Sequence, residues 1–299
     1  MPSHVVAARP AERWALLGLL VFTAIAVAGY WNFALHPQRL PQTPSAQHFF
    51  AISFQFFGRL HIAVSAAALA VVLVGRLGAR WVPAMVGAYA VAFFAEHLGT
   101  GYGIPFGEYA YSGLLGYKLG GRVPALIPLS WFLMGLPAWV VARAAFPESA
   151  TRRIAVAALM LVAWDLALDP AMSFLAPYWI WQDTGPYYGM PWVNLAGWWI
   201  TGAVIMVLLE RLGGALPPEA LPLRWMAGYY LAVLLMPVGM LAAAGHWLAV
   251  GVTAAGVGAC AWVARDAWRV GEAGLAPGAE DEGTTTADAR EDRVLVGAP

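Results

Sequence analysis

Two aspartates lie one helical turn apart in an apolar segment, a spacing that supports proton transfer. Asp165 and Asp169 stand at positions i and i+4, and Pro170 follows directly. In a helix this spacing puts both carboxyl groups on one face, with Cβ atoms about 5–6 Å apart. Two carboxylates this close in a low dielectric do not both ionise easily, so we expect one to hold a proton at neutral pH. Because Pro170 cannot donate a helical hydrogen bond, we expect the helix to bend or end there.

Further polar residues fall at a similar depth when each apolar segment is counted from its cytoplasmic end. At about 1.5 Å per residue, a layer roughly 18–24 Å from that end contains Arg59, Glu96, Asp165, Asp169 and Asn194. His61 lies nearly as deep, and His97 adjoins Glu96. Charged residues inside membrane spans are costly and usually face the bundle interior or a wet cavity. The sequence therefore predicts that these residues form one site.

A structural role is the alternative for each of these residues. Asp165 can pair with Arg59 or cap a neighbouring helix, and His61 and His97 can each be a hydrogen-bonded histidine of the bundle interior. Two Asp, one Glu, one Arg and one His at one depth favour the functional interpretation.

The composition indicates that a membrane surrounds these residues. Hydrophobic residues make up 61% of the chain and charged residues 11%, and the mean hydropathy is +0.64, whereas an average soluble domain has about 25% charged residues. A formal net charge of zero gives no indication of a nucleic-acid partner. Cys260 is the single cysteine, which excludes an intramolecular disulfide. We expect an all-α fold, a polytopic transmembrane helix bundle.

Apolar stretches close to the roughly 20 residues that cross a bilayer predict about eight helices, near residues 14–31, 50–74, 81–96, 123–146, 154–172, 192–209, 225–243 and 246–264. Arginine is concentrated in alternate connections, so the positive-inside rule places both termini in the cytoplasm of a cell whose cytoplasmic membrane the chain spans. This count retains the first helix, for which a cleaved signal peptide is the alternative. The domain prediction is a short cytoplasmic N-terminus (1–12), one transmembrane domain (13–270) and a disordered cytoplasmic tail (271–299).

Two connections expected on the outer side carry a matching pattern. Residues 102–106 read Tyr-Gly-Ile-Pro-Phe and residues 188–192 read Tyr-Gly-Met-Pro-Trp. A weak internal repeat of two helical hairpins and a chance recurrence of a common turn both explain the match. Many aromatic residues surround these connections, either as an interfacial girdle or as the lining of a tunnel for a long apolar, polyene substrate. In a tunnel, ring faces would stabilise a cationic intermediate by about 0.5–2 kcal/mol each.

The candidate substrate-contacting residues combine the polar layer with these aromatics: Arg59, His61, Tyr102, Tyr109, Trp131, Trp181, Tyr188, Asn194 and Trp198. The sequence contains no dinucleotide-binding fingerprint and no P-loop. Its six histidines are scattered singly, unlike the clusters that hold iron in membrane hydroxylases. We therefore expect no metal and no cofactor, and the residues suit acid chemistry on an alkene.

The central region resembles the bacterial and archaeal membrane carotenoid biosynthesis family. The resemblance covers about residues 90–200 and is carried by residues 96–111, Pro124, Pro128, Trp131, 164–170, Trp179, Trp181, Gly185, 187–191, Asn194, Gly197 and Trp198. That family includes cofactor-independent carotenoid hydratases, which add water across the terminal 1,2 double bond of an acyclic carotene end group.

The resemblance implies a mechanism that the residues permit. Protonated Asp165 or Asp169 gives its proton to the less substituted alkene carbon, and water attacks the tertiary cation. Glu96, with His97 beside it, orients this water and takes its proton by general acid–base catalysis, while Arg59 holds one carboxylate ionised. The implied partners are water and a carotene drawn from the bilayer. A homo-oligomer or an association with other carotenoid enzymes is compatible with this picture.

Two other function classes remain open. In a membrane prenyltransferase, Asp165 and Asp169 would hold magnesium and a diphosphate, although the outer loops carry only Lys118 and Arg122 after the third helix. A carotenoid or lipid carrier, or a transporter with broken helices and a midplane polar site, would involve no reaction.

Overall fold

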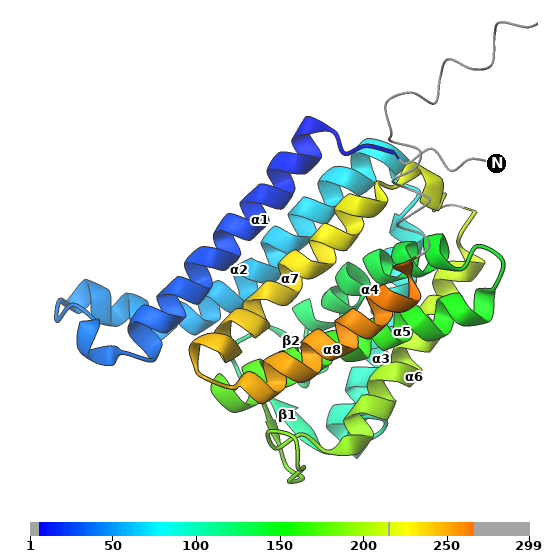
Figure 1. The fold of residues 1–299 in the computed structure, drawn as a ribbon. Coiled ribbons are helices and arrows are strands. Elements are labelled where there is room, and N and C mark those ends of the chain that lie inside the picture. The colour runs from blue at the N-terminus through cyan, green and yellow to red at the C-terminus, as the bar shows by residue number, and fades with distance from the viewer. Residues whose placement is uncertain (1–5, 215, 266–299) are drawn as a thin grey trace, which may run out of the picture.

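The computed structural model describes residues 6–214 and 216–265. This part of the chain folds into eight α-helices (Figure 1): α1 (Pro10–Gly29), α2 (Pro44–Leu77), α3 (Val82–Tyr102), α4 (Leu126–Ala145), α5 (Ala150–Asp169), α6 (Trp192–Arg211), α7 (Leu223–Ala243) and α8 (Trp247–Val263). Seven are long and apolar enough to cross a membrane, and α8 is a shorter apolar helix of 17 residues. The prediction of an all-α, multi-pass membrane bundle is confirmed. The orientation of the termini stays a prediction, and the tail expected at 271–299 lies outside the described residues.

Proline changes the helix type where α5 ends. The α-helix stops at Asp169 and the chain continues as a π-helical segment, η3 (Pro170–Leu175). Pro170 has no N–H to donate to the carbonyl of Leu166, and the hydroxyl of Tyr187 donates to that carbonyl instead, at 2.7 Å. The expected break at Pro170 is therefore a local rewinding, and it ties α5 to the loop that follows. A second π-helical segment, η1 (Tyr30–Ala34), continues α1, and two short 3-10 turns, η2 (Pro37–Arg39) and η4 (Pro218–Ala220), lie in connections.

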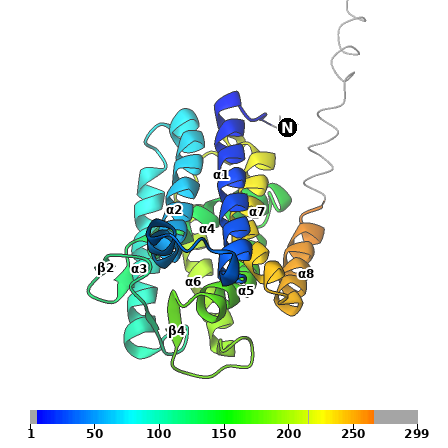
Figure 2. The same ribbon diagram turned by 90° about the vertical axis from the view of Figure 1, so that its left-hand side faces the viewer.

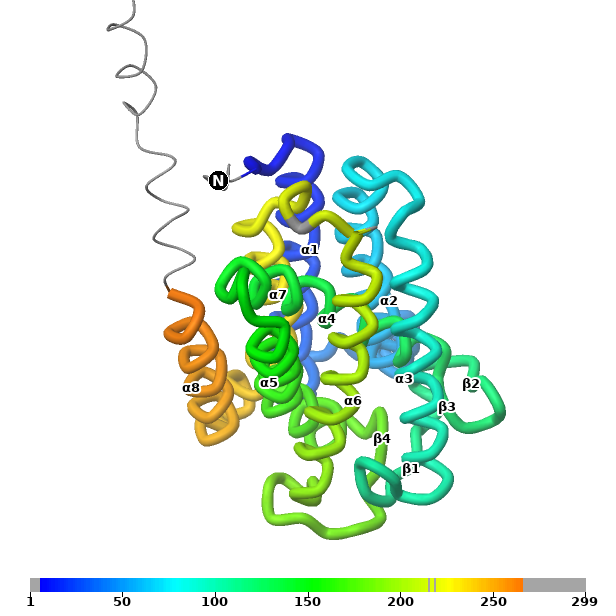
Figure 3. The backbone as a smooth tube through the Cα atoms, turned by 90° about the vertical axis from the view of Figure 1, so that its right-hand side faces the viewer, coloured from blue at the N-terminus to red at the C-terminus, as the bar shows by residue number. Residues whose placement is uncertain are grey.

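Short strands join the two connections that carry the matching pattern. β1 (Tyr109–Tyr111) follows α3, and β4 (Trp179–Trp181) follows α5. They pair antiparallel, with Tyr109 opposite Trp181 and Tyr111 opposite Trp179. A second pair, β2 (Lys118–Leu119) with β3 (Val123–Pro124), precedes α4. Figure 3 shows these strands together at one end of the bundle, which we call the strand end.

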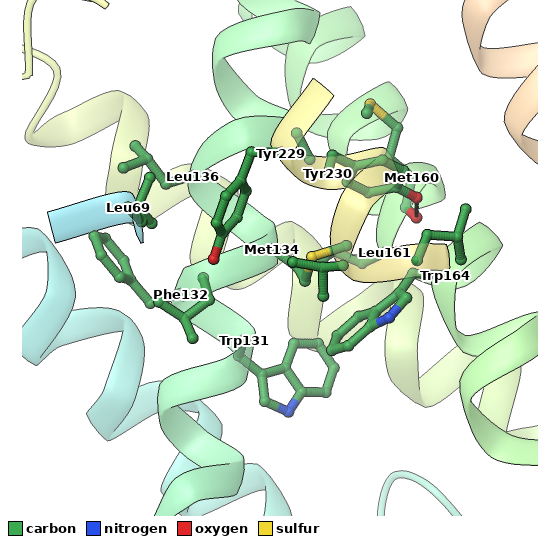
Figure 4. Packing of buried hydrophobic residues seen from close by; sticks show 14 of the residues in the cluster. Leu69, Trp131, Phe132, Met134, Leu136, Met160, Leu161, Trp164, Tyr229 and Tyr230 are labelled. Carbon is green, nitrogen blue, oxygen red and sulfur yellow. Dashed lines mark hydrogen bonds between the residues drawn. The ribbon is translucent and has the colours of Figure 1, made fainter. Parts of the chain in front are cut away.

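The other helices enclose α4 and the C-terminal half of α5. Residues 131–142 of α4 are all buried, because α4 packs against α3, α5 and α7. Helix α1 lies on the outside, against α2 and α7 (Figure 2), and buries only four residues. Figure 4 shows the core that results, with Leu69 of α2, Met134 of α4, Trp164 of α5 and Tyr229 of α7 converging from four helices.

Candidate active site at the strand end

Three carboxyl groups line one small cavity, which we call the acid chamber. Glu96 of α3 and Asp165 and Asp169 of α5 expose at most 4% of their surface. The cavity volume is about 30 Å³, enough for about one or two water molecules. Its lining comes from α3, the strand end, α4, α5 and α6: Glu96, Phe106, Tyr109, Tyr111, Ile127, Ser130, Trp131, Asp165, Leu168, Asp169, Trp179, Trp181, Asn194 and Trp198.

The carboxylate of Asp169 is held by two indoles of β4. Trp179 Nε1 donates to Oδ1 at 2.6 Å, and Trp181 Nε1 lies 3.1 Å from both oxygens. Residues two apart on a strand point to the same face, so both indoles reach the end of α5. Asp169 thus has its acceptor positions occupied by N–H donors.

The carboxylate of Glu96 is held in the same manner by β1 and α4. The hydroxyls of Tyr109 and Tyr111 both donate to Oε2, the latter at 2.7 Å, and Trp131 Nε1 donates to Oε1 at 3.0 Å. Burial and the nearby charge of Glu96 raise the pKa of both tyrosines well above its ordinary value. The two hydroxyls therefore remain protonated and act as donors.

Asp165 is the carboxyl group with the fewest partners. Asn194 of α6 donates from Nδ2 to Oδ2 at 2.8 Å, and the same amide lies 2.9 Å from Met190 Sδ. Oδ1 is buried and has no hydrogen-bond partner among the described residues. A buried polar atom without a partner is rare in native structures, which points to an oxygen that meets a substrate.

Aromatic rings form the remaining walls. Trp131 and Trp198 stack with ring centroids 4.2 Å apart, and Trp164 meets Trp198 edge to face at 5.5 Å. Tyr109 and Trp181 also line the chamber, with ring centroids 5.1 Å apart. The negative ring faces of such residues attract a cation, so the chamber suits a positively charged intermediate.

A second cavity adjoins the acid chamber, and we call it the apolar cavity. Its volume is about 80 Å³. Ile127, Ser130, Leu168 and Trp179 line both cavities. The rest of its lining is Gly58, His61, Ile62, Ser65, Leu115, Leu133, Met134, Trp164, Met172, Tyr178, Val233, Met236 and Pro237. The apolar cavity therefore shares one wall with the acid chamber, and the carboxyl groups lie on the chamber side of that wall.

The structure brings most of the predicted site residues together. Eight line the acid chamber: Glu96, Tyr109, Trp131, Asp165, Asp169, Trp181, Asn194 and Trp198. His61 lines the apolar cavity instead.

Four predicted residues lie outside both linings. Arg59 donates to the carbonyls of Leu114 and Gly113, at 2.8 and 3.2 Å, so its hydrogen bonds go to the β1–β2 connection and to Gln55. The other three are His97, whose ring packs beside Phe93, Tyr102, which is 71% exposed, and Tyr188, whose ring contacts Phe174, Tyr187 and His246.

Tyr111 and Trp179 also hold the carboxylates, and the sequence prediction did not name them among the site residues. Both belong to short alternating runs, Tyr-Ala-Tyr at 109–111 and Trp-Ile-Trp at 179–181. Alternation of this kind is typical of a strand. A strand prediction from this alternation places the two aromatic residues of each run on one face.

The fold and the two cavities define a multi-pass membrane protein with an acidic site beside an apolar pocket. The chain belongs to the carotenoid biosynthesis protein family, whose model matches residues 57–259, and the predicted resemblance is confirmed. The chain is also 35% identical over 135 residues to bisanhydrobacterioruberin hydratase of Haloarcula japonica, a match that covers 42% of this chain and 44% of that protein. The match thus spans less than half of that relative's length. No solved structure matches the chain.

Proposed function

We propose that the protein is a carotenoid hydratase, a hydro-lyase that adds water across the terminal 1,2 double bond of an acyclic carotene end group without a cofactor. The observation that carries this proposal is the unpartnered Oδ1 of Asp165, buried in a chamber of three carboxyl groups beside an apolar cavity. The family and the hydratase relative support the substrate class.

Asp165 is the proton donor in this proposal. No Lys or Arg is among the described residues that line the chamber, so its three carboxyl groups cannot all be charged in so small a buried space. Glu96 accepts hydrogen bonds from three donors, and Asp169 from two indoles, one of which is shared between both oxygens; these bonds stabilise the charged form of each carboxylate. Asp165 accepts one, so the proton resides there.

The reaction follows from this arrangement. The carotene end group enters the apolar cavity, and its double bond lies at the wall shared with the acid chamber. Asp165 transfers its proton to the less substituted alkene carbon, which leaves a tertiary cation next to the carboxylate just formed. Water adds to the cation through its oxygen and loses one proton, and that proton restores Asp165. Glu96, Asp169 and the indole faces stabilise the cation in the meantime.

Expression in a lycopene-producing bacterium tests the proposal. The wild-type chain should convert lycopene into a product heavier by one water, as measured by mass analysis of extracted pigments. Asp165→Asn keeps the shape of the side chain but has no acidic proton, so it should abolish this product while the protein stays in the membrane fraction. Asp183→Asn, at an exposed loop position, is the matched control and should hydrate normally. Good expression of the wild type without an added-water product would refute the function.

A further inference from the structure

Two residues that line the apolar cavity carry a buried polar side-chain atom without a hydrogen-bond partner, and the proposed reaction uses neither. Ser65 Oγ of α2 and Trp164 Nε1 of α5 are buried, and neither has a hydrogen-bond partner among the described residues. Both side chains line the apolar cavity, and the residues are only 1% and 4% exposed. By contrast, Ser130 in the same lining donates to the carbonyl of Ile127 at 2.7 Å. A buried polar group left unpaired is destabilising, so two in one lining point to a ligand that pairs with them.

The two atoms lie at the depth of the proton donor. Ser65 is 12 residues from the end of α2 at Leu77, and Trp164 is 14 residues from the start of α5 at Ala150. These separations correspond to roughly 18 and 21 Å along the helices. Trp164 directly precedes Asp165 in the chain. An oxygen bound between these groups would therefore lie in the layer where the double bond is protonated.

A histidine in the same lining has a defined tautomer. Thr23 of α1 donates its hydroxyl hydrogen to the carbonyl of Leu19 at 2.8 Å, and His61 Nε2 lies 3.2 Å from the same Thr23 oxygen. Because that oxygen has no second hydrogen to give, the hydrogen between Thr23 and His61 belongs to His61 Nε2. In the neutral ring Nδ1 is then the acceptor. His61 precedes Ser65 by four residues, so both lie on one face of α2, and both line the cavity.

We propose that Ser65, Trp164 and His61 form the water site of the hydratase, with His61 Nδ1 as the general base. Trp164 can only donate, so its N–H binds the water oxygen, and Ser65 orients the molecule toward His61. The oxygen of the attacking water becomes the oxygen of the product's tertiary alcohol. The same groups therefore hold the hydroxyl after the reaction.

The proton balance closes over one cycle. Asp165 gives a proton to carbon from the side of the acid chamber, and water attacks the neighbouring carbon from the side of the apolar cavity. As the new C–O bond forms, one O–H bond of the water breaks and its proton passes to His61 Nδ1. Return of that proton to the Asp165 carboxylate restores both groups. This inference rests on the proposed function and assigns it a base that lies outside the acid chamber, in the lining of the apolar cavity.

Hydration of lycopene by the full-length protein in liposomes made with D₂O separates this role from a structural one. Asp165 then delivers deuterium to carbon, and a cation that meets no bound water loses a proton and returns a labelled alkene. His61→Gln removes the base, and Trp164→Phe removes the N–H while keeping a ring. Each should lower the formation of hydrated product about a hundredfold, while recovered lycopene still gains deuterium. Asp165→Asn should give neither product nor label.

His48→Gln and Trp262→Phe, both at exposed positions, are the matched controls and should behave as the wild type. Wild-type hydration rates in His61→Gln and Trp164→Phe would overturn the inference and leave the proposed function intact. A joint loss of hydration and deuterium uptake in these two variants would also overturn the inference, because a distorted site loses both steps together. If the wild type itself forms no hydrated product, the proposed function fails, and this inference fails with it.

Discussion

The side-chain amide of Asn194 on α6 donates to Oδ2 of Asp165 on α5 at 2.8 Å and leaves Oδ1 without a protein partner. Because an N–H donor faces Oδ2, a proton on this carboxyl group resides on Oδ1. The contact therefore does more than join two helices: it selects the oxygen that carries the proton.

Replacement of Asn194 by Leu should lower hydration without removing the acid. Leucine keeps the branching at Cγ but no longer orients Asp165, and loss of one hydrogen bond to a charged or acidic group costs about 1.5–3 kcal/mol, or roughly 10- to 100-fold in rate. Initial rates of lycopene hydration in membranes measure the effect. Asn32→Leu, in η1 away from the chamber, is the control. A rate equal to wild type in Asn194→Leu would show that the amide has no orienting role.

The indoles of β4 should matter to the rate more than to the fold. Trp179→Phe and Trp181→Phe keep an aromatic ring but each remove an N–H donor from Asp169. The charged form of Asp169 then loses one of the N–H donors that stabilise it in a buried site. The proton therefore shifts from Asp165 toward Asp169, and the rate should fall roughly 10-fold or more. Trp192→Phe, at a 60% exposed position, is the comparison. Equal rates in all three variants would contradict this account.

The tyrosines of β1 give a prediction for alkaline pH. An ordinary tyrosine ionises at about pH 10, but burial and the charge of Glu96 raise the pKa of Tyr109 and Tyr111 well above that value. The raised pKa keeps the neutral O–H form, and thus both hydrogen bonds to Glu96, as the pH passes 10. The hydration rate of the wild type should therefore not fall near pH 10. If the wild-type rate does fall there, and the fall is absent from Tyr111→Phe, then Tyr111 ionises near pH 10.

The sequence was sufficient to predict the bundle and most of the chamber because both depend on simple patterns. Apolar runs set the helices, and carboxyl groups are so costly in such runs that Glu96, Asp165 and Asp169 had to converge. Depth along a helix, however, says nothing about direction around it. Arg59 and His97 have the right depth, yet the first binds carbonyls of the loop and the second packs beside Phe93.

The partners of the carboxylates were harder to predict than the carboxylates themselves. Tyr111 and Trp179 reach the chamber because β1 pairs with β4, and this pairing joins loops about 70 residues apart in sequence. Strands of three residues carry little signal of their own. Their register is fixed by the helices that bring the loops together, so it appears only in the folded chain.

Helix α6 approaches the strand end closely at Gly197. A Cβ atom at Gly197 would lie 2.6 Å from the carbonyl oxygen of Pro105 and 2.7 Å from the ring of Phe106. The ring can turn, but the backbone carbonyl cannot, so Gly197→Ala must push α6 away from the loop. Such overpacking typically costs about 1–3 kcal/mol. It should also reduce hydration, because Asn194 lies on the same helix and Phe106 lines the chamber.

Thermal unfolding in detergent, followed by tryptophan fluorescence, together with hydration rates, checks this prediction. Gly18→Ala is the matched control, because a Cβ there meets no atom within 4 Å and alanine favours a helix over glycine by about 1 kcal/mol. The control should be as stable as the wild type or slightly more stable, with normal hydration. If Gly197→Ala matches the control in both measurements, then α6 tolerates a side chain at this contact, and the position of Asn194 does not depend on the close approach to Pro105.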